Sequence, residues 1–196
     1  MAKITHLTSA DYVRQPWRNG GGTTTELARD GGTDRWLWRL SVADVDRSGP
    51  FSDFTGYRRI IMLLEGSGMS LSFACAPPVV LDRRYRPFAF DGGIRTECML
   101  LDGPVRDMNL IVDDTNVDAS LDVRVLECEA SWLIELSASA LLHAIAGRFD
   151  VAIDAQRVAL APGDTLRIDD AASSTISAFA LEASAVLVHA ALEHRQ

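Results

Sequence analysis

Apolar side chains occur along this chain in short runs, and within many runs they alternate with polar or smaller residues. In residues 36–42, two tryptophans, a leucine and a valine alternate with Leu37, Arg39 and Ser41. A period of two places successive side chains on opposite faces of a β-strand. The pattern therefore predicts a strand with one apolar face and a second face that carries an arginine.

The same pattern continues toward the C-terminal end, with Gly, Pro and Asp in most of the gaps. Residues 59–65 and 69–73 flank a Gly66-Ser67-Gly68 turn and predict a hairpin. Further strands are expected at residues 88–90, 95–101, 105–112, 123–128, 132–136, 141–146, 149–153, 158–160, 165–168, 175–181 and 185–191. Many short strands separated by turn residues are typical of an all-β sandwich or barrel. We expect few short helices, with one candidate at residues 138–142.

The two halves of the chain show a weak internal repeat. An apolar run ends at Gly66 in the first half and at Gly147 in the second, and a proline-led turn and a closing strand follow in each half. Two copies of one small barrel plan explain this order. We expect a first barrel over residues 1–120, which includes the N-terminal segment, and a second, smaller barrel over residues 121–196, packed as one compact unit.

Charge and composition argue against several classes of protein. The 196 residues include 19 Lys and Arg against 27 Asp and Glu, a net charge of −8, and this acidic balance predicts no direct nucleic-acid partner. The first residues do not predict a signal peptide, and no apolar stretch predicts a membrane span. Cys75, Cys98 and Cys128 form no paired motif, which argues against a disulfide scaffold or a zinc ribbon. Free thiols suit a reducing compartment, so we expect a cytoplasmic protein.

Two arginines in strand-like runs are the main candidates for ligand binding. Arg39 lies opposite the tryptophans of its strand, and Arg59 opens the most apolar run of the chain. A guanidinium at such a position either pairs with a carboxylate of the protein, for instance that of Glu65 or Asp107, or faces a cavity that receives one. Because the guanidinium fork binds a carboxylate through two hydrogen bonds, the second alternative predicts a pocket for a small acid.

Other polar residues are candidates for further contacts. Asp107 and Asn109 are two residues apart and share one strand face, where Asn109 could bind an amide or formyl group or complete a barrel corner. The glycine and threonine run at residues 20–25 lacks the spacing and the lysine of a nucleotide-binding P-loop. It forms either an anion-binding nest or a tight turn into a threonine-rich strand.

Three more residues have two interpretations each. Phe88 shares a strand face with Phe90 and is expected to pack inside the first barrel. Trp17 belongs either to the core or to a pocket wall. Glu65 precedes a glycine turn and is either simply exposed or part of the site.

An ordered set of motifs resembles one protein family. The motifs are Trp17–Glu26 (WRNGGGTTTE), Trp38–Ala43 (WRLSVA), Gly49–Arg59 (GPFSDFTGYRR), Leu63–Gly66 (LLEG), Arg86–Gly92 (RPFAFDG) and Asp107–Leu110 (DMNL). This set resembles the HutD/Ves family of cupin-like proteins. The resemblance covers residues 16–112 and implies a bicupin-type double β-barrel. It also implies an association with bacterial histidine utilisation, in which the family's proposed role is to bind N-formylglutamate or a related acid. The Ves branch is described only as stress-induced, and no established reaction accompanies the family.

The resemblance and the strand pattern together define the expected site. The expected ligand-binding residues are Arg59, Arg39, Asn109, Asn19, Thr23, Thr24 and Thr25, with Glu65, Asp107, Phe88 and Trp17 as secondary candidates. A metal-binding cupin presents two histidines one residue apart, whereas the histidines here are scattered singly along the chain. We therefore expect no metal and no other cofactor.

Three hypotheses for function follow. The first is a metal-free binding protein for a small carboxylate metabolite that modulates histidine utilisation. The second is an isomerase or hydrolase of a small polar acid that uses Glu65 or Asp107 as its general base. The third is a protein-interaction module of a stress response. A homodimer through a sheet edge or the tryptophan-rich strand is compatible with all three.

Overall fold

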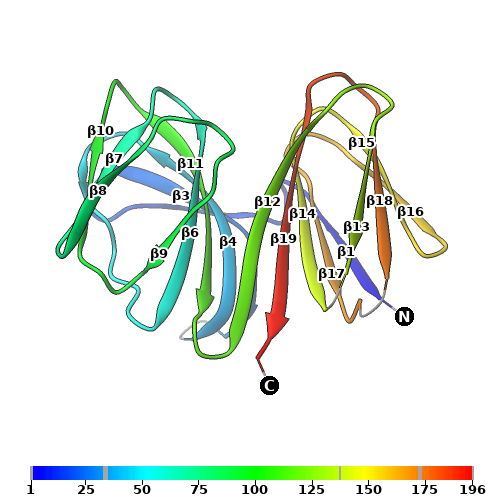
Figure 1. Cartoon of the computed structure of the whole chain (residues 1–196), viewed down its shortest axis with the longest axis horizontal. Helices are drawn as coiled ribbons and strands as arrows, with labels where there is room; N and C mark the ends of the chain where they lie inside the picture. Colours follow the sequence, from blue (N-terminus) through cyan, green and yellow to red (C-terminus); the bar gives the residue numbers. More distant parts are fainter. Residues whose placement is uncertain (1, 33–34, 137, 172–173, 196) are drawn as a thin grey trace. The chain divides into compact units, whose positions relative to one another are not determined.

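The computed structural model describes residues 2–32, 35–136, 138–171 and 174–195 (Figure 1). These residues form strands, turns and loops without a helix, which confirms the all-β class. The helix considered at residues 138–142 is wrong. This segment begins strand β14 (Ser139–Ala146), which pairs on both sides with neighbouring strands, so pairing overrides the helix preference of its alanine and leucines. Within the described residues, no helix is long and apolar enough to cross a membrane.

The chain folds into two compact units, Val13–Val117 and the combination of Met1–Tyr12 with Asp118–Gln196. The sequence predicts a boundary after residue 120 and assigns the whole N-terminal segment to the first barrel. The structure instead groups that segment with the C-terminal half. The reason is strand β1 (Lys3–Leu7), which pairs antiparallel with β17 (Thr165–Asp169).

The unit Val13–Val117 contains two antiparallel sheets. One has the order β2-β3-β4-β11-β6-β9, and the other has the order β5-β10-β7-β8. The strands of the larger sheet are β2 (Val13–Pro16), β3 (Gly22–Gly31), β4 (Trp36–Val45), β11 (Val105–Asp113), β6 (Tyr57–Glu65) and β9 (Phe88–Asp91). Those of the smaller sheet are β5 (Gly49–Pro50), β10 (Thr96–Leu100), β7 (Met69–Phe73) and β8 (Ala76–Leu81). Buried apolar residues from both sheets form one core cluster, as expected for a two-sheet sandwich.

The second unit also contains two sheets, with the orders β1-β17-β14-β19-β12 and β13-β18-β15-β16. Their remaining strands are β12 (Val117–Leu126), β13 (Ser131–Glu135), β15 (Phe149–Ile153), β16 (Gln156–Leu160), β18 (Thr175–Ala180) and β19 (Ala185–His194). The core cluster of this unit consists of apolar side chains from both sheets, with Phe149 completely buried.

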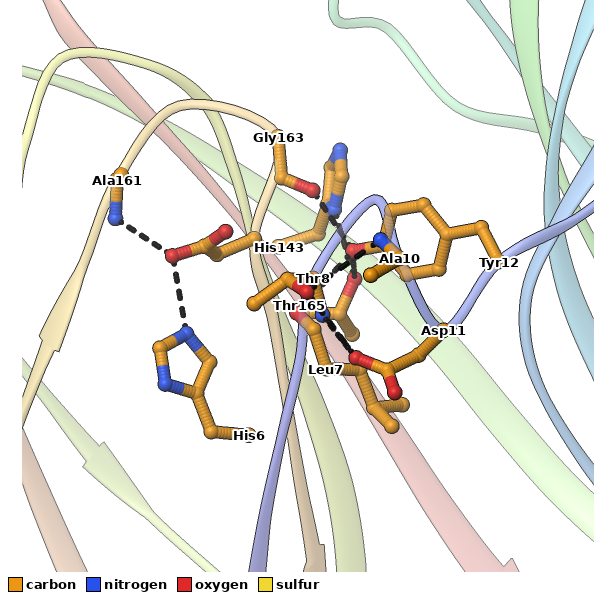
Figure 2. Close-up of polar contacts among 11 residues, drawn as sticks. His6, Leu7, Thr8, Ala10, Asp11, Tyr12, His143, Ala161, Gly163 and Thr165 are labelled. Atoms are coloured by element: carbon orange, nitrogen blue, oxygen red, sulfur yellow. Dashed lines mark hydrogen bonds and ion pairs between the residues drawn. The ribbon is translucent and has the colours of Figure 1, made fainter.

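A chain of hydrogen bonds, which runs from the surface to a buried threonine, attaches the N-terminal segment to this unit (Figure 2). The Tyr12 hydroxyl donates to the Gly163 carbonyl at 2.7 Å and also lies 2.7 Å from the Thr165 hydroxyl. His143 Nδ1 lies 2.9 Å from the same Thr165 hydroxyl. Because the only hydroxyl proton of Tyr12 goes to Gly163, Thr165 donates to Tyr12 and His143 donates to Thr165.

Candidate functional site

The register of three adjacent strands brings Arg39 and Arg59 to one face of the larger sheet. Ile111 on β11 is the cross-strand partner of Arg39 on β4 and of Arg59 on β6. Cross-strand partners point to the same side of a sheet, so the two arginines flank Ile111. On the same strands, Ser41 and Asn109 form the next cross-strand pair on this face.

These side chains line a cavity of about 430 Å³ within the unit Val13–Val117. Its polar lining residues are Gln15, Arg18, Asn19, Thr24, Glu26, Arg39, Ser41, Ser52, Arg59, Asp107 and Asn109. Its other lining residues are Val13, Pro16, Trp17, Ala43, Pro50, Phe51, Phe54 and Ile111. The volume lies within the range of about 300–1,000 Å³ that is usual for small-molecule sites.

Arg59 is a buried cation at the wall of this cavity. Its side chain is surrounded by the rings of Phe51, Phe54 and Phe90, whose centroids lie 4.7, 5.4 and 5.1 Å from its Cζ atom. Arg59 Nη2 donates to Asn109 Oδ1 at 2.7 Å, but its buried Nε atom has no hydrogen-bond partner among the described residues. Burial lowers the pKa of Arg59 to about 10, so the group remains charged at neutral pH.

Arg39, like Arg59, packs against aromatic rings at the wall of the cavity. Its Cζ atom lies 5.1 Å from the Trp36 ring centroid and 5.4 Å from that of Phe54. Its buried Nε atom also has no hydrogen-bond partner in the part of the chain that the structure describes. Burial lowers the pKa of Arg39. The carboxylate of Glu26, which also lines the cavity, pairs with Arg29 at 3.3 Å. Both arginines therefore retain a donor for an additional acceptor.

Asp107 and Asn109 are buried residues that line the cavity. The Asn109 amide donates through Nδ2 to Asp107 Oδ1 while its own Oδ1 accepts from Arg59, so the amide connects the carboxyl group to the guanidinium. Asp107 is only 1% exposed, and burial raises its pKa to about 7. Glu65, the other carboxylate proposed as an arginine partner, is exposed at the end of β6 and contacts Arg106 at 3.4 Å.

The glycine and threonine segment supplies one wall of the cavity. Trp17 donates through Nε1 to the Thr24 hydroxyl at 2.8 Å, and both residues line the cavity. A Cβ atom on Gly22 would lie 3.2 Å from the Trp17 ring and 2.3 Å from the Asp44 carbonyl oxygen, so a glycine is required there. Asn19 Oδ1 accepts from the Gly21 amide at 2.9 Å and closes the turn before β3.

The structure brings Arg39, Arg59, Asn109, Asn19 and Thr24 together at this cavity. The secondary candidates Asp107 and Trp17 also line it, whereas Thr23 and Thr25, Glu65 and Phe88 are not among its lining residues. The two threonines flank Thr24 and project to the opposite face of β3. Phe88 packs with Phe73 and Phe90, at ring-centroid distances of 6.1 and 5.9 Å.

Sequence reasoning missed several lining residues. Ser41 and Glu26 could have been found by extending the period of two from Arg39 and Thr24. Phe51 and Phe54 follow β5 in an irregular segment, where no period indicates which side chains face the arginines. In the described part of the chain, no group of three or more His, Cys, Asp or Glu side chains is arranged to hold a metal ion.

Comparison with known proteins shows to which family this chain belongs. The family model described as HutD matches residues 9–188. This chain belongs to the HutD family. An uncharacterised 21.2 kDa protein in the hutC 3′ region of Pseudomonas putida is 47% identical to it over 113 residues, which is 57% of this chain and 59% of that protein. Shorter stretches of the Ves proteins match as well, so the chain spans about half of the length of the curated relatives it matches.

Solved structures of this family share the fold over nearly the whole chain. A conserved protein of unknown function from Pseudomonas aeruginosa PAO1 is 38% identical, with a TM-score of 0.89 over 97% of this chain and 99% of that one. HutD from Pseudomonas fluorescens SBW25 is 33% identical, with a TM-score of 0.80 over 99% and 100%. More distant structures, among them an Escherichia coli pirin with 11% identity and a TM-score of 0.66, share the cupin-like fold alone.

Proposed function

We propose that this HutD-family protein binds a small carboxylate metabolite in the cavity of the unit Val13–Val117. The observation that supports the proposal is the pair of guanidiniums, Arg39 and Arg59, each with a buried Nε donor that has no acceptor within the described residues. A buried donor without an acceptor lowers stability, and a ligand carboxylate would supply the acceptor. The aromatic rings around both guanidiniums leave the open cavity as the direction from which an anion can approach.

The names of the relatives indicate a class of ligand. One solved relative is named HutD, and a curated relative is described by its position beside hutC. We infer that the ligand is N-formylglutamate or a related acid of histidine degradation and that binding modulates histidine utilisation. In this arrangement Arg39 and Arg59 would bind carboxylate, and Asn109, Asn19 and Thr24 would offer hydrogen bonds to the remaining polar groups.

A thermal-shift series tests this proposal. The purified, chelator-treated protein is melted with N-formylglutamate, urocanate, histidine, glutamate and unrelated acids. A ligand present at 100 times its Kd adds about 2.7 kcal/mol to the unfolding free energy. For a chain of this length, that gain raises Tm by roughly 5–10 °C.

Arg59→Ala should abolish the rise, whereas Arg58→Ala, at the next position on β6, should retain it. Arg58 is a matched control because it is not among the residues that line the cavity. A flat response to every acid, with both variants behaving like the unsubstituted protein, would overturn the carboxylate-binding proposal.

One observation favours an enzyme as the second candidate. Asp107 is a buried carboxyl group with a pKa raised to about 7 by burial, and it lines a cavity, as a general base would. Turnover of one of the same acids by metal-free protein, lost in Asp107→Asn, would support an isomerase or hydrolase. Binding without turnover would leave the binding protein as the function.

A further inference from the structure

Asp107 is a buried acid that no cation contacts within the described part of the chain. Its side chain is 1% exposed and accepts a hydrogen bond from Asn109 Nδ2. Arg59 reaches Asp107 only through the Asn109 amide, because the guanidinium donates to Asn109 Oδ1. A directly paired carboxylate would stay ionised, whereas a buried one without a contacting cation favours its neutral form.

The charged and titratable groups around Asp107 come from four neighbouring strands. Arg59 on β6 favours the ionised carboxylate, and Asp44 on β4 opposes it. Asp44 is itself bound to Arg106 Nε at 3.1 Å. On β10, burial raises the pKa of the Cys98 thiol to about 12, so this group is neutral and does not compete for protons near pH 7.

Arg39 on β4, Glu26 on β3 and Arg18, an exposed residue between β2 and β3, line the same cavity. Glu26 pairs with Arg29, so its charge is locally compensated. Burial outweighs the attraction of Arg59 and raises the pKa of Asp107 to about 7. Asp107 therefore gains and loses its proton within the physiological pH range, as expected for a buried carboxyl group that no cation of the described residues contacts.

The charge of the cavity then depends on Asp107. When Asp107 is ionised, its negative charge offsets one of the two arginines, and a monocarboxylate completes the balance. When Asp107 is neutral, Arg39 and Arg59 are uncompensated; the third lining arginine, Arg18, is exposed, so water screens its charge. A ligand with two carboxylates then completes the balance. Uncompensated charge is costly away from water, so the cavity charge and the ligand charge are coupled.

We propose that a dicarboxylate binds in this cavity together with one proton from solvent, which Asp107 holds in the complex. This inference rests on the proposed carboxylate-binding function and names the class of acid. In the balanced step, the protein with ionised Asp107, the dianion and one proton form a complex in which the Asp107 carboxyl is neutral. A matched monocarboxylate binds without that proton.

The predicted signature is a pH-dependent affinity. If only the protonated form of Asp107 accepts the dianion, the observed Kd rises with pH through the range around 7 and becomes about tenfold larger at pH 8 than at pH 6. The two carboxyl groups of N-formyl-L-glutamate are ionised throughout this range, so the proton does not come from the ligand. The histidines lie outside the residues that line the cavity.

Isothermal titration calorimetry on the full chain measures both quantities. N-formyl-L-glutamate is titrated at pH 7 and 8 in phosphate and in Tris, and at pH 6 in phosphate and in Bis-Tris. The different ionisation enthalpies of the paired buffers give the number of protons taken up. We expect close to one proton per ligand at pH 8 and close to none at pH 6. N-formyl-L-glutamine, in which an amide replaces one carboxylate, should show neither proton uptake nor the tenfold change.

Asp107→Asn keeps the acceptor for the Asn109 amide and should remove both the proton uptake and the pH dependence. Glu97→Gln, at an exposed acid on β10 of the same unit, is the control and should keep both. The calorimetry of the unsubstituted protein answers the question even if Asp107→Asn does not fold. Dicarboxylate binding without proton uptake would overturn this inference and leave the proposed function intact, whereas no binding by any acid would overturn both.

Discussion

Under the proposed carboxylate-binding function, Arg59 would favour ligand binding at the expense of the stability of the free protein. It is a cation with 6% exposure whose Nε atom has no acceptor and whose only hydrogen bond within the described residues goes to the Asn109 amide. Replacement of such a charge by an apolar side chain of similar volume is often neutral or stabilising. A purely structural arginine would have the opposite property.

Arg59→Met tests this distinction. We expect the unfolding free energy of the ligand-free protein to stay unchanged or to rise by about 1 kcal/mol, because the buried charge is removed while its volume is kept. The stabilisation by N-formylglutamate should be lost. Urea denaturation with and without this ligand measures both effects, and a loss of more than about 2 kcal/mol in the ligand-free protein would show that Arg59 is structural.

For single residues, the sequence predicts which side chains lie at the cavity better than it predicts which residues they contact. Alternation within one strand predicts that Arg39 lies opposite Trp36 and Trp38, and the structure puts Arg39 at the cavity. For Trp36 the prediction is wrong, because its ring centroid lies 5.1 Å from Arg39 Cζ. The Arg59–Asn109–Asp107 connection depends on the register of β6 with β11, which no local pattern determines. Alternation alone also separates Thr24 from Thr23 and Thr25, although the run of three identical residues obscures it.

At the scale of single elements, the start of β3 determines the cavity wall. Gly22 lies where the Trp17 ring and the Asp44 carbonyl leave no room for a Cβ atom. Gly22→Ala should therefore push Trp17 out of place and reduce stability by about 1–3 kcal/mol, the usual cost of overpacking. Urea denaturation followed by tryptophan fluorescence measures the loss, and ligand affinity should fall with it because Trp17 lines the cavity.

Gly49→Ala is the matched control for this variant. Gly49 has no atom within 4 Å of its virtual Cβ position and does not adopt a positive φ angle. Its substitution should change stability by less than about 0.5 kcal/mol. Equal effects of the two substitutions would contradict the packing explanation and indicate a general loss of backbone freedom.

Most strands follow from the period of two, because one face of each is buried against a core. Helix propensity misleads at residues 138–142, where a run of alanine and leucine lies in β14 between two partner strands. The pairing of β1 with β17 also escapes prediction. The two strands are separated by most of the chain, and nothing in the local pattern of Lys3–Leu7 specifies a partner.

At the scale of the whole molecule, the cavity described above lies within one of the two units. The second unit has an apolar core cluster that includes Phe149, whereas the unit Val13–Val117 combines an apolar cluster with a polar cavity. The weak repeat in the sequence predicts two similar barrels, but it does not predict a polar cavity in the first. That cavity depends on a few polar residues at inward-facing positions, such as Arg59 and Asn109.

The second unit is assembled from both ends of the chain, and Tyr12 connects them. Tyr12→Phe removes the hydroxyl that donates to the Gly163 carbonyl and leaves the Thr165 hydroxyl without its acceptor. The loss of stability should be about 1–3 kcal/mol, since the hydroxyl of Thr165, a completely buried residue, is left without its acceptor. Hydrogen exchange should accelerate first at the amides of β1 and β17, the strands that this network holds together.

Tyr85→Phe is the control, because the Tyr85 hydroxyl makes no hydrogen bond within the residues that the structure describes. It should leave stability and exchange unchanged. If Tyr12→Phe had equally little effect, the β1–β17 ladder alone would be sufficient to hold the N-terminal segment. If Tyr12→Phe has the expected effect, the second unit is held together by a contact between Tyr12 and Thr165, which are 153 positions apart. Folding of this unit then requires both ends of the chain.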